Sequence, residues 1–165
     1  EQHVSEPFIT DKMPSNFRWV GFILNAFPDA KIVHVTRDAR ATCWSIFKIF
    51  FNATGLGYSN NLHDVSEYYK MYVDLMAFWR EKFPERLYDL KYESLTLNQE
   101  YETRKLLDYI ELDWEPQCLE FHKTNRAVRT ASATQVRQKM YQGSSEEWRE
   151  YEPYLASMIE NLKAF

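Results

Sequence analysis

Residues 31–45 read KIVHVTRDARATCWS, and the predicted fold rests on this stretch. Its first part, Lys31–Thr36, is short and rich in β-branched side chains, which is typical of a buried strand. Asp38 is a favourable helix N-cap, so we expect an apolar-faced helix over residues 39–51. Arg37 falls between the two elements, at the edge where parallel α/β sheets bind ligands.

Hydrophobic spacing on both sides of this unit predicts more helices and one more strand. The expected helices cover residues 14–26, 64–82 and 98–111, and the expected strand covers residues 87–92. Ser15 or Asn16 would cap the first of these helices. Ser144 and Glu147 match a capping box that would open the last helical region.

The order of these elements predicts an α/β fold with parallel strands and crossover helices. No linker or repeat divides the chain, so residues 1–165 are expected to belong to one domain. Two strands make a thin sheet, because sheets usually have about four to six strands. We therefore expect the domain to be incomplete at its N-terminus.

Composition and charge exclude several classes of protein. Hydrophobic residues make up 45% of the chain, which argues against disorder, and no apolar run approaches the roughly 20 residues of a membrane span. The net charge of −4 argues against a nucleic-acid partner. Cys43 and Cys118 are too few for a disulfide framework and lack metal-ligand spacing. We expect no metal site and a cytoplasmic setting.

The basic residues are unevenly distributed. Residues 121–145 contain no Asp or Glu, but they contain Lys123, Arg126, Arg129, Arg137 and Lys139. In an acidic protein such a stretch can serve a small anionic ligand, although a solvated basic loop has the same composition.

Arg37 and Ser45 form a candidate phosphate site. Ser45 lies eight residues after Arg37, on the helix that Asp38 would cap, so both side chains can reach one anion near the strand end. The arginine would supply a charge-assisted fork of hydrogen bonds. The alternative is a surface pair between Arg37 and Asp38 beside a buried serine.

Residues 27–45, FPDAKIVHVTRDARATCWS, resemble the second signature of sulfotransferases that use 3′-phosphoadenosine-5′-phosphosulfate (PAPS). In that family a strand ends in an arginine, a serine follows at this spacing, and both contact the 3′-phosphate of the nucleotide. The run RDARAT is most similar to tyrosylprotein sulfotransferases and their bacterial relatives. The resemblance implies that Arg37 and Ser45 bind the nucleotide and that the sheet is P-loop-NTPase-like.

Two further segments resemble the same family. Residues 11–17, DKMPSNF, are similar to its Lys-x-Pro-x-Asn element, which implies a catalytic Lys12 near the transferring sulfuryl group. Residues 91–95, KYESL, are similar to its Tyr-Glu-x-Leu element, which implies that Tyr92 packs by the nucleotide. A flexible exposed lysine and an ordinary core tyrosine are the alternatives.

Residues 129–138, RTASATQVRQ, look like the family's C-terminal loop that covers the nucleotide. This resemblance gives the acid-free basic stretch a purpose. It implies nucleotide contacts by Ser132, Arg137 and Lys139.

Two departures from the family pattern stand out. The family's first motif is a loop rich in Gly, Ser or Thr, and Arg that wraps the 5′-phosphosulfate, and nothing here matches it. The glycines are Gly21, Gly55, Gly57 and Gly143. Relatives often place a basic residue before the Trp that matches Trp148, whereas this chain has Glu147. Glu147 puts one phosphate contact of the family in doubt, and the missing loop leads us to expect that the chain is inactive alone.

The function that these features imply is sulfuryl transfer from PAPS to an acceptor hydroxyl, on a peptide tyrosine, a glycan or a small alcohol. No general base can be named: His34 is expected in the core, and His63 and His122 have no evident partner. A nucleotide or nucleoside kinase-like fragment is one alternative, but its Gly-x-x-x-x-Gly-Lys-Ser/Thr run is absent from the sequence. A non-catalytic interaction domain, suggested by 11 Tyr, 11 Phe and 5 Trp, is the other.

Overall fold

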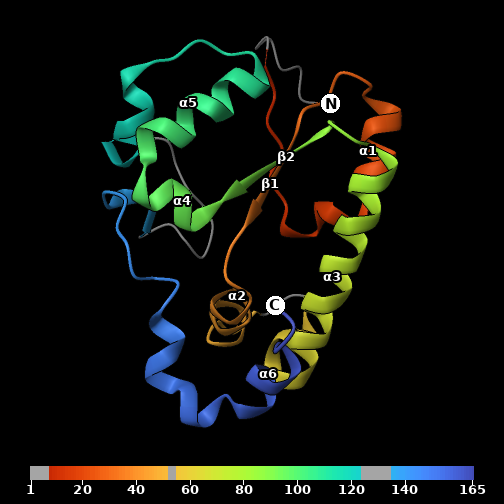
Figure 1. Ribbon diagram of the computed structural model, residues 1–165, viewed down its shortest axis with the longest axis vertical. Helices are drawn as coiled ribbons and strands as arrows, with labels where there is room; N and C mark the ends of the chain where they lie inside the picture. Colours follow the sequence, from red (N-terminus) through yellow and green to blue (C-terminus); the bar gives the residue numbers. More distant parts are fainter. Residues whose placement is uncertain (1–7, 52–54, 124–134) are drawn as a thin grey trace.

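The computed structural model describes residues 8–51, 55–123 and 135–165 (Figure 1). Strands β1 (Ile32–Thr36) and β2 (Leu87–Lys91) pair in parallel, with Thr36 opposite Lys91. The α-helices are α1 (Val20–Ala26), α2 (Ala39–Phe47), α3 (Leu62–Lys82), α4 (Tyr92–Leu97), α5 (Gln99–Ile110) and α6 (Ala156–Asn161). The 3₁₀ helices are η1 (Pro14–Arg18), η2 (Gly57–Asn60), η3 (Pro116–Lys123), η4 (Gln135–Arg137) and η5 (Glu147–Tyr154).

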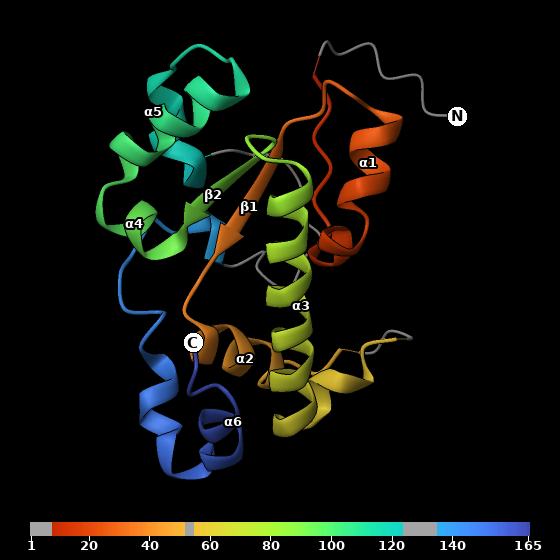
Figure 2. The same cartoon turned by 45° about the vertical axis from the view of Figure 1, so that its right-hand side comes forward.

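The two strands lie in the middle of the molecule, with α1 and α3 on one side and α4 and α5 on the other (Figures 1 and 2). Helices α2 and α6 lie beyond the carboxyl end of β1. The predicted α/β class with parallel strands and crossover helices is confirmed for the described residues. No helix among residues 8–51, 55–123 and 135–165 is long and apolar enough to cross a membrane.

The unit around Arg37 forms as predicted, with one difference in length. Asp38 caps α2, because its Oδ1 accepts a hydrogen bond from the Ala41 backbone N–H at 2.8 Å. The helix ends at Phe47 instead of residue 51.

The predicted helix over residues 14–26 is divided into η1 and α1. The break falls at Trp19, whose φ of −116° and ψ of 6° are not α-helical. The Trp79 indole donates a hydrogen bond of 2.7 Å to the nearby Phe17 carbonyl. Neither predicted cap is used, because η1 is preceded by Met13 and the Asn16 amide donates to Asp11 instead.

The predicted capping box at Ser144 and Glu147 is wrong. The Ser144 hydroxyl is hydrogen-bonded to Tyr92 at 2.9 Å, and the Glu147 carboxylate pairs with Lys48 at 2.6 Å. Helix η5 begins at Glu147 without a side-chain cap. Both polar groups are thus used in tertiary contacts rather than in local ones.

The main core lies between α2, α3, η5 and α6. Its buried members are Ala39, Ala41, Cys43, Val65, Trp148, Leu155, Met158 and Leu162. Burial is the main cause that raises the pKa of the Cys43 thiol to about 12, so this cysteine stays protonated and unreactive at neutral pH.

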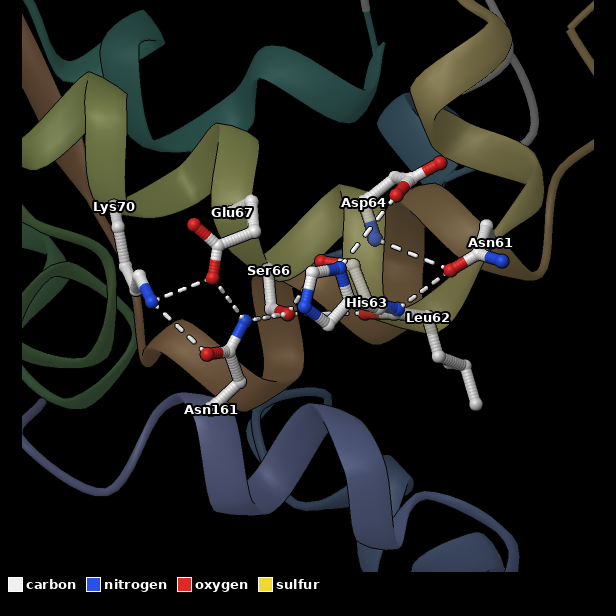
Figure 3. A network of polar contacts seen from close by, with 8 residues as sticks. All are labelled: Asn61, Leu62, His63, Asp64, Ser66, Glu67, Lys70 and Asn161. Atoms are coloured by element: carbon white, nitrogen blue, oxygen red, sulfur yellow. Dashed lines mark hydrogen bonds and ion pairs between the residues drawn. The ribbon is translucent and has the colours of Figure 1, made fainter.

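A polar network joins α6 to α3 beside this core (Figure 3). The Asn161 amide donates to Ser66 Oγ and to Glu67 Oε1, both at 2.7 Å. Lys70 donates to the same Glu67 oxygen at 2.6 Å and to Asn161 Oδ1 at 2.9 Å. Ser66 is fully buried, and its hydroxyl donates to the His63 carbonyl at 2.7 Å while it accepts from Asn161, so both its donor and its acceptor are satisfied.

The strand β1 is half-buried on one face and exposed on the other. Val33 and Val35 are 37% and 55% exposed, so the expectation of a fully buried strand is wrong for this face. The opposite face carries His34, whose Nδ1 lies 2.5 Å from Asp89 Oδ1 and whose Nε2 contacts the Tyr72 hydroxyl on α3. A carboxylate can only accept, so Nδ1 donates to Asp89 and Nε2 accepts from Tyr72. His34 is therefore half-buried between β1, β2 and α3 rather than part of the buried core that was expected.

Gly21 lies against the Trp79 ring. A Cβ atom at position 21 would lie 2.8 Å from Cζ3 of that ring, which its indole hydrogen bond holds in place. We expect Gly21→Ala to lower the free energy of unfolding by about 1–3 kcal/mol in urea unfolding, because of overpacking. Gly57→Ala is the matched control, since its added Cβ meets nothing within 4 Å among the described residues. Stabilisation by Gly21→Ala, as helix propensity alone predicts, would contradict this reading of the contact.

The half-buried His34 should make the free energy of unfolding depend on pH. Burial lowers its pKa, although the Asp89 carboxylate opposes this effect. Below a pH of about 6.5 the unfolded chain binds a proton at this position that the folded protein does not, so stability falls as pH drops from 7.5 through the folded pKa. We expect this slope in thermal melts of the wild type and a smaller slope in His34→Asn. Equal slopes in both proteins would show that His34 is not the source of this pH dependence.

Candidate functional site

A cavity of about 170 Å³ lies at the carboxyl end of β1. Its lining comes from the ends of β1 and α2, from the start of α4 and from the chain segment that leads into η5. Its lining residues are Val35, Arg37, Ser45, Lys48, Tyr92, Tyr141, Ser144 and Glu147.

Arg37 is held in this cavity by neutral groups. Its Nε donates to Ser145 Oγ at 3.1 Å, and an Nη donates to the Ser144 backbone carbonyl. Its guanidinium carbon lies 5.1 Å from the centroid of the Tyr92 ring, within the range of a cation–π contact. No described carboxylate lies within 4.0 Å of it; Asp38 pairs with Arg40 instead, so the surface pair considered from the sequence does not form. The positive charge of Arg37 is oriented but not neutralised by a direct ion pair.

Ser45 lines the same cavity from the side of α2. It is half-buried, and within the part of the chain that the structure describes its hydroxyl has no hydrogen bond. A hydroxyl facing a cavity in this state can bind an incoming oxygen without breaking a contact.

Glu93 supports Arg37 indirectly. Its Oε1 accepts from Ser145 Oγ at 2.6 Å and from the Asp38 backbone N–H at 3.0 Å. Burial alone would raise the pKa of Glu93, but these hydrogen bonds and the charge of Arg37 outweigh it and hold the pKa below its usual range. Glu93 is therefore ionised at neutral pH, and Ser145, which donates to it, can accept the bond from Arg37.

A second cation lies in the cavity lining. Lys48, at the end of α2, pairs with Glu147 at 2.6 Å, and both side chains remain partly exposed. The cavity thus contains two basic side chains, one carboxylate and several hydroxyl groups, which suits a small multiply charged anion.

Comparison with known proteins agrees with this geometry. The sequence model of the Sulfotransferase family matches residues 1–116, a range that includes Arg37, Ser45, Tyr92 and Glu93. The chain belongs to the sulfotransferase family.

Two relatives of this sulfotransferase-family chain are much longer than it is. An uncharacterized protein of Aquifex aeolicus (strain VF5) is 40% identical over 159 residues, which are 95% of this chain and 21% of the relative. A protein-tyrosine sulfotransferase of Drosophila melanogaster is 26% identical over 113 residues, which are 68% of this chain and 23% of the relative. The chain spans about a fifth of the length of these curated relatives.

The structure brings together some of the residues that the sequence singled out. Arg37, Ser45 and Tyr92 line one cavity. Lys12, Arg137 and Lys139 are exposed, and none of them is among the residues that line the cavity. Ser132 lies outside the residues that the structure describes. The roles of these residues in ligand binding stay predictions.

The sequence reasoning missed several members of the site. Lys48, Glu93 and Ser145 are not among the candidates that the sequence predicts, and Ser144 and Glu147 are predicted only as a helix cap. The Tyr-Glu pair at residues 92–93 was the signal for Glu93. Lys48 also had a local signal, since it lies one helical turn after Ser45.

Ser145 is the link between Arg37 and Glu93, so its removal should cost stability. We expect Ser145→Ala to lower the free energy of unfolding by about 1–2 kcal/mol in urea at pH 7, because the Glu93 carboxylate and the Arg37 Nε each lose a partner. The loss should shrink as pH falls and Glu93 becomes protonated, since a group with a depressed folded pKa stabilises only above that pKa. Ser157→Ala, at an exposed position of α6, is the control. A loss that does not change with pH would argue against the Glu93 link.

Proposed function

We propose that this chain provides the nucleotide 3′-phosphate site of a sulfotransferase that uses PAPS. The observation that carries the proposal is the shared cavity of Arg37 and Ser45 at the carboxyl end of β1. In this proposal the guanidinium of Arg37 and the hydroxyl of Ser45 bind the phosphate oxygens, and Tyr92 packs by the nucleotide. The sulfuryl group passes from PAPS to an acceptor hydroxyl.

The size of the cavity agrees with a phosphate rather than with a whole nucleotide. Sites for drug-sized ligands usually have volumes of about 300–1,000 Å³. A cavity of about 170 Å³ is smaller than this, but it is several times the roughly 30 Å³ that a water molecule occupies in the liquid. One phosphate group can therefore enter while the nucleoside lies outside the cavity.

The charge around the cavity supports the same ligand. Arg37 donates to one serine hydroxyl and one backbone carbonyl, so part of its fork of five N–H donors remains for an anion. Charge-assisted forks are the strongest side-chain contacts to phosphate. The neighbouring hydroxyl of Ser45 adds a neutral donor from α2.

The other parts of the proposed catalyst rest on the sequence resemblance. Lys12 would stabilise the negative charge that grows on the leaving phosphate, which requires no metal. Ser132, Arg137 and Lys139 would hold the nucleotide from the C-terminal segment. The sequence has no match to the family's 5′-phosphosulfate loop. We infer that these residues alone bind nucleotide without transferring sulfate, and that the two strands belong to a P-loop-NTPase-like sheet.

The acceptor carries a hydroxyl group in this proposal. One similar protein is a protein-tyrosine sulfotransferase, which makes the phenol of a peptide tyrosine the first acceptor to test. The fold alone does not select the acceptor, because helices and loops outside the phosphate site do so.

The phosphate site can be tested by calorimetric titration of the full chain with adenosine 3′,5′-bisphosphate, 5′-AMP and ATP. We expect the bisphosphate to bind most tightly, and Arg37→Met to weaken it by about 10–100-fold, the effect of losing charge-assisted hydrogen bonds of about 1.5–3 kcal/mol. Ser45→Ala should weaken it by roughly 3–10-fold, the effect of one neutral hydrogen bond. Neither change should affect 5′-AMP, which lacks the 3′-phosphate.

Arg104→Met is the matched control for the loss of a positive charge. Arg104 lies on α5, pairs with Glu100 at 2.7 Å and does not line the cavity. We expect wild-type affinity from this variant. A preference for ATP, or equal binding of the bisphosphate and 5′-AMP, would refute the proposed function.

A further inference from the structure

Lys48 and Glu147 form an ion pair within the lining of the phosphate cavity. Lys48 lies three residues after Ser45 at the end of α2, so both residues project from one side of that helix. Glu147 lies at the start of η5 and contributes its carboxylate to the same lining. Their Nζ and Oε2 atoms are 2.6 Å apart.

The pair is poorly suited to a purely structural role. The side chains of Lys48 and Glu147 are 36% and 41% exposed, and ion pairs at that exposure contribute little to stability because water screens them. A cavity offered to a phosphate would also be expected to exclude a carboxylate, since two negative charges in one small space repel each other. We therefore infer that Glu147 has a role in ligand binding.

The segment from Ser144 to Glu147 contacts both basic side chains of the cavity. Ser144 and Ser145 accept the hydrogen bonds of Arg37, and Glu147 pairs with Lys48. Arg37 is held by neutral acceptors, so its charge remains available to an anion. Lys48 is held by a charge, so an anion must replace Glu147 in order to contact it.

We propose that Lys48 is a third contact to the bound phosphate and that Glu147 is its counter-ion in the empty site. Binding exchanges the carboxylate of Glu147 for the ligand phosphate at the Lys48 ammonium group. Glu147 thereby lowers the affinity for every anion that enters this cavity, but least for a doubly charged phosphomonoester, which attracts Lys48 more strongly than a carboxylate does. This inference rests on the proposed function for the identity of the anion.

The exchange predicts opposite effects for the two partners. In calorimetric titrations of the full chain with adenosine 3′,5′-bisphosphate, Glu147→Gln should tighten binding by roughly threefold to tenfold, because the competing charge is lost. Lys48→Met should weaken binding by about fivefold to twentyfold, because a contact to phosphate is lost. The double variant should gain much less over Lys48→Met than Glu147→Gln gains over the wild type, since without the lysine only direct repulsion is relieved and no competition. Binding of 5′-AMP should be unchanged in all three.

Glu150→Gln is the matched control, because it removes the same charge from η5 at an exposed position that does not line the cavity. If Glu147→Gln and Glu150→Gln have equal effects, the exchange is refuted. If Glu147→Gln tightens binding equally with and without Lys48, Glu147 only repels the ligand and the contact by Lys48 is refuted. If the wild type does not bind adenosine 3′,5′-bisphosphate more tightly than 5′-AMP and ATP, the proposed function itself is refuted.

Thermal melts show whether each variant is folded, so that a change in affinity is not caused by unfolding. If Lys48→Met does not fold, Lys48→Gln and Glu147→Gln provide the same comparison, since each changes one side of the pair. Raised salt gives a second readout: in the wild type, screening should weaken both the resting pair and ligand binding, whereas Glu147→Gln should retain a larger affinity at every salt concentration.

Discussion

The guanidinium group of Arg37 is the interaction on which the rest of the site depends. It stands at the end of β1 and binds two residues that follow it by 107 and 108 positions in the sequence. Ser145 links Arg37 to Glu93, and the Glu93 carboxylate also accepts a hydrogen bond from the backbone N–H of Asp38, the N-cap of α2. Three segments that are far apart in the chain therefore meet at one charged side chain, and their packing fixes its direction.

This arrangement orients a positive charge before a ligand arrives. The Glu93 carboxylate is connected to the Arg37 guanidinium through the Ser145 hydroxyl. It offsets part of the positive charge of Arg37 without forming a direct ion pair with it. Polar groups that are held in place in advance bind anions more effectively than mobile ones, because little reorganisation is needed on binding. The ionised state of Glu93 is thus a condition for the direction of Arg37 as well as for stability.

The C-terminal core supports the same site from a distance. Leu155, Met158 and Leu162 pack between α2 and α3, and Asn161 fixes α6 to α3 through the network with Ser66, Glu67 and Lys70 (Figure 3). Trp148, in η5, is buried in this core, directly after Glu147. Placing Trp148 therefore also places Glu147 at the cavity and brings Ser144 and Ser145 to Arg37.

The sequence by itself determined the strand, the Asp38 cap and the helix that carries Ser45, because β-propensity, capping and apolar spacing act between neighbouring residues. It also identified the end of β1 as the place for Arg37, since that follows from the alternation of strand and helix. Only the tertiary structure decided which groups surround Arg37. Ser144 and Glu147 carry a local capping signal, but a tyrosine hydroxyl and a lysine from other elements bind them in the folded chain. Such contacts depend on how the C-terminal core packs, and a pattern of adjacent residues does not contain that information.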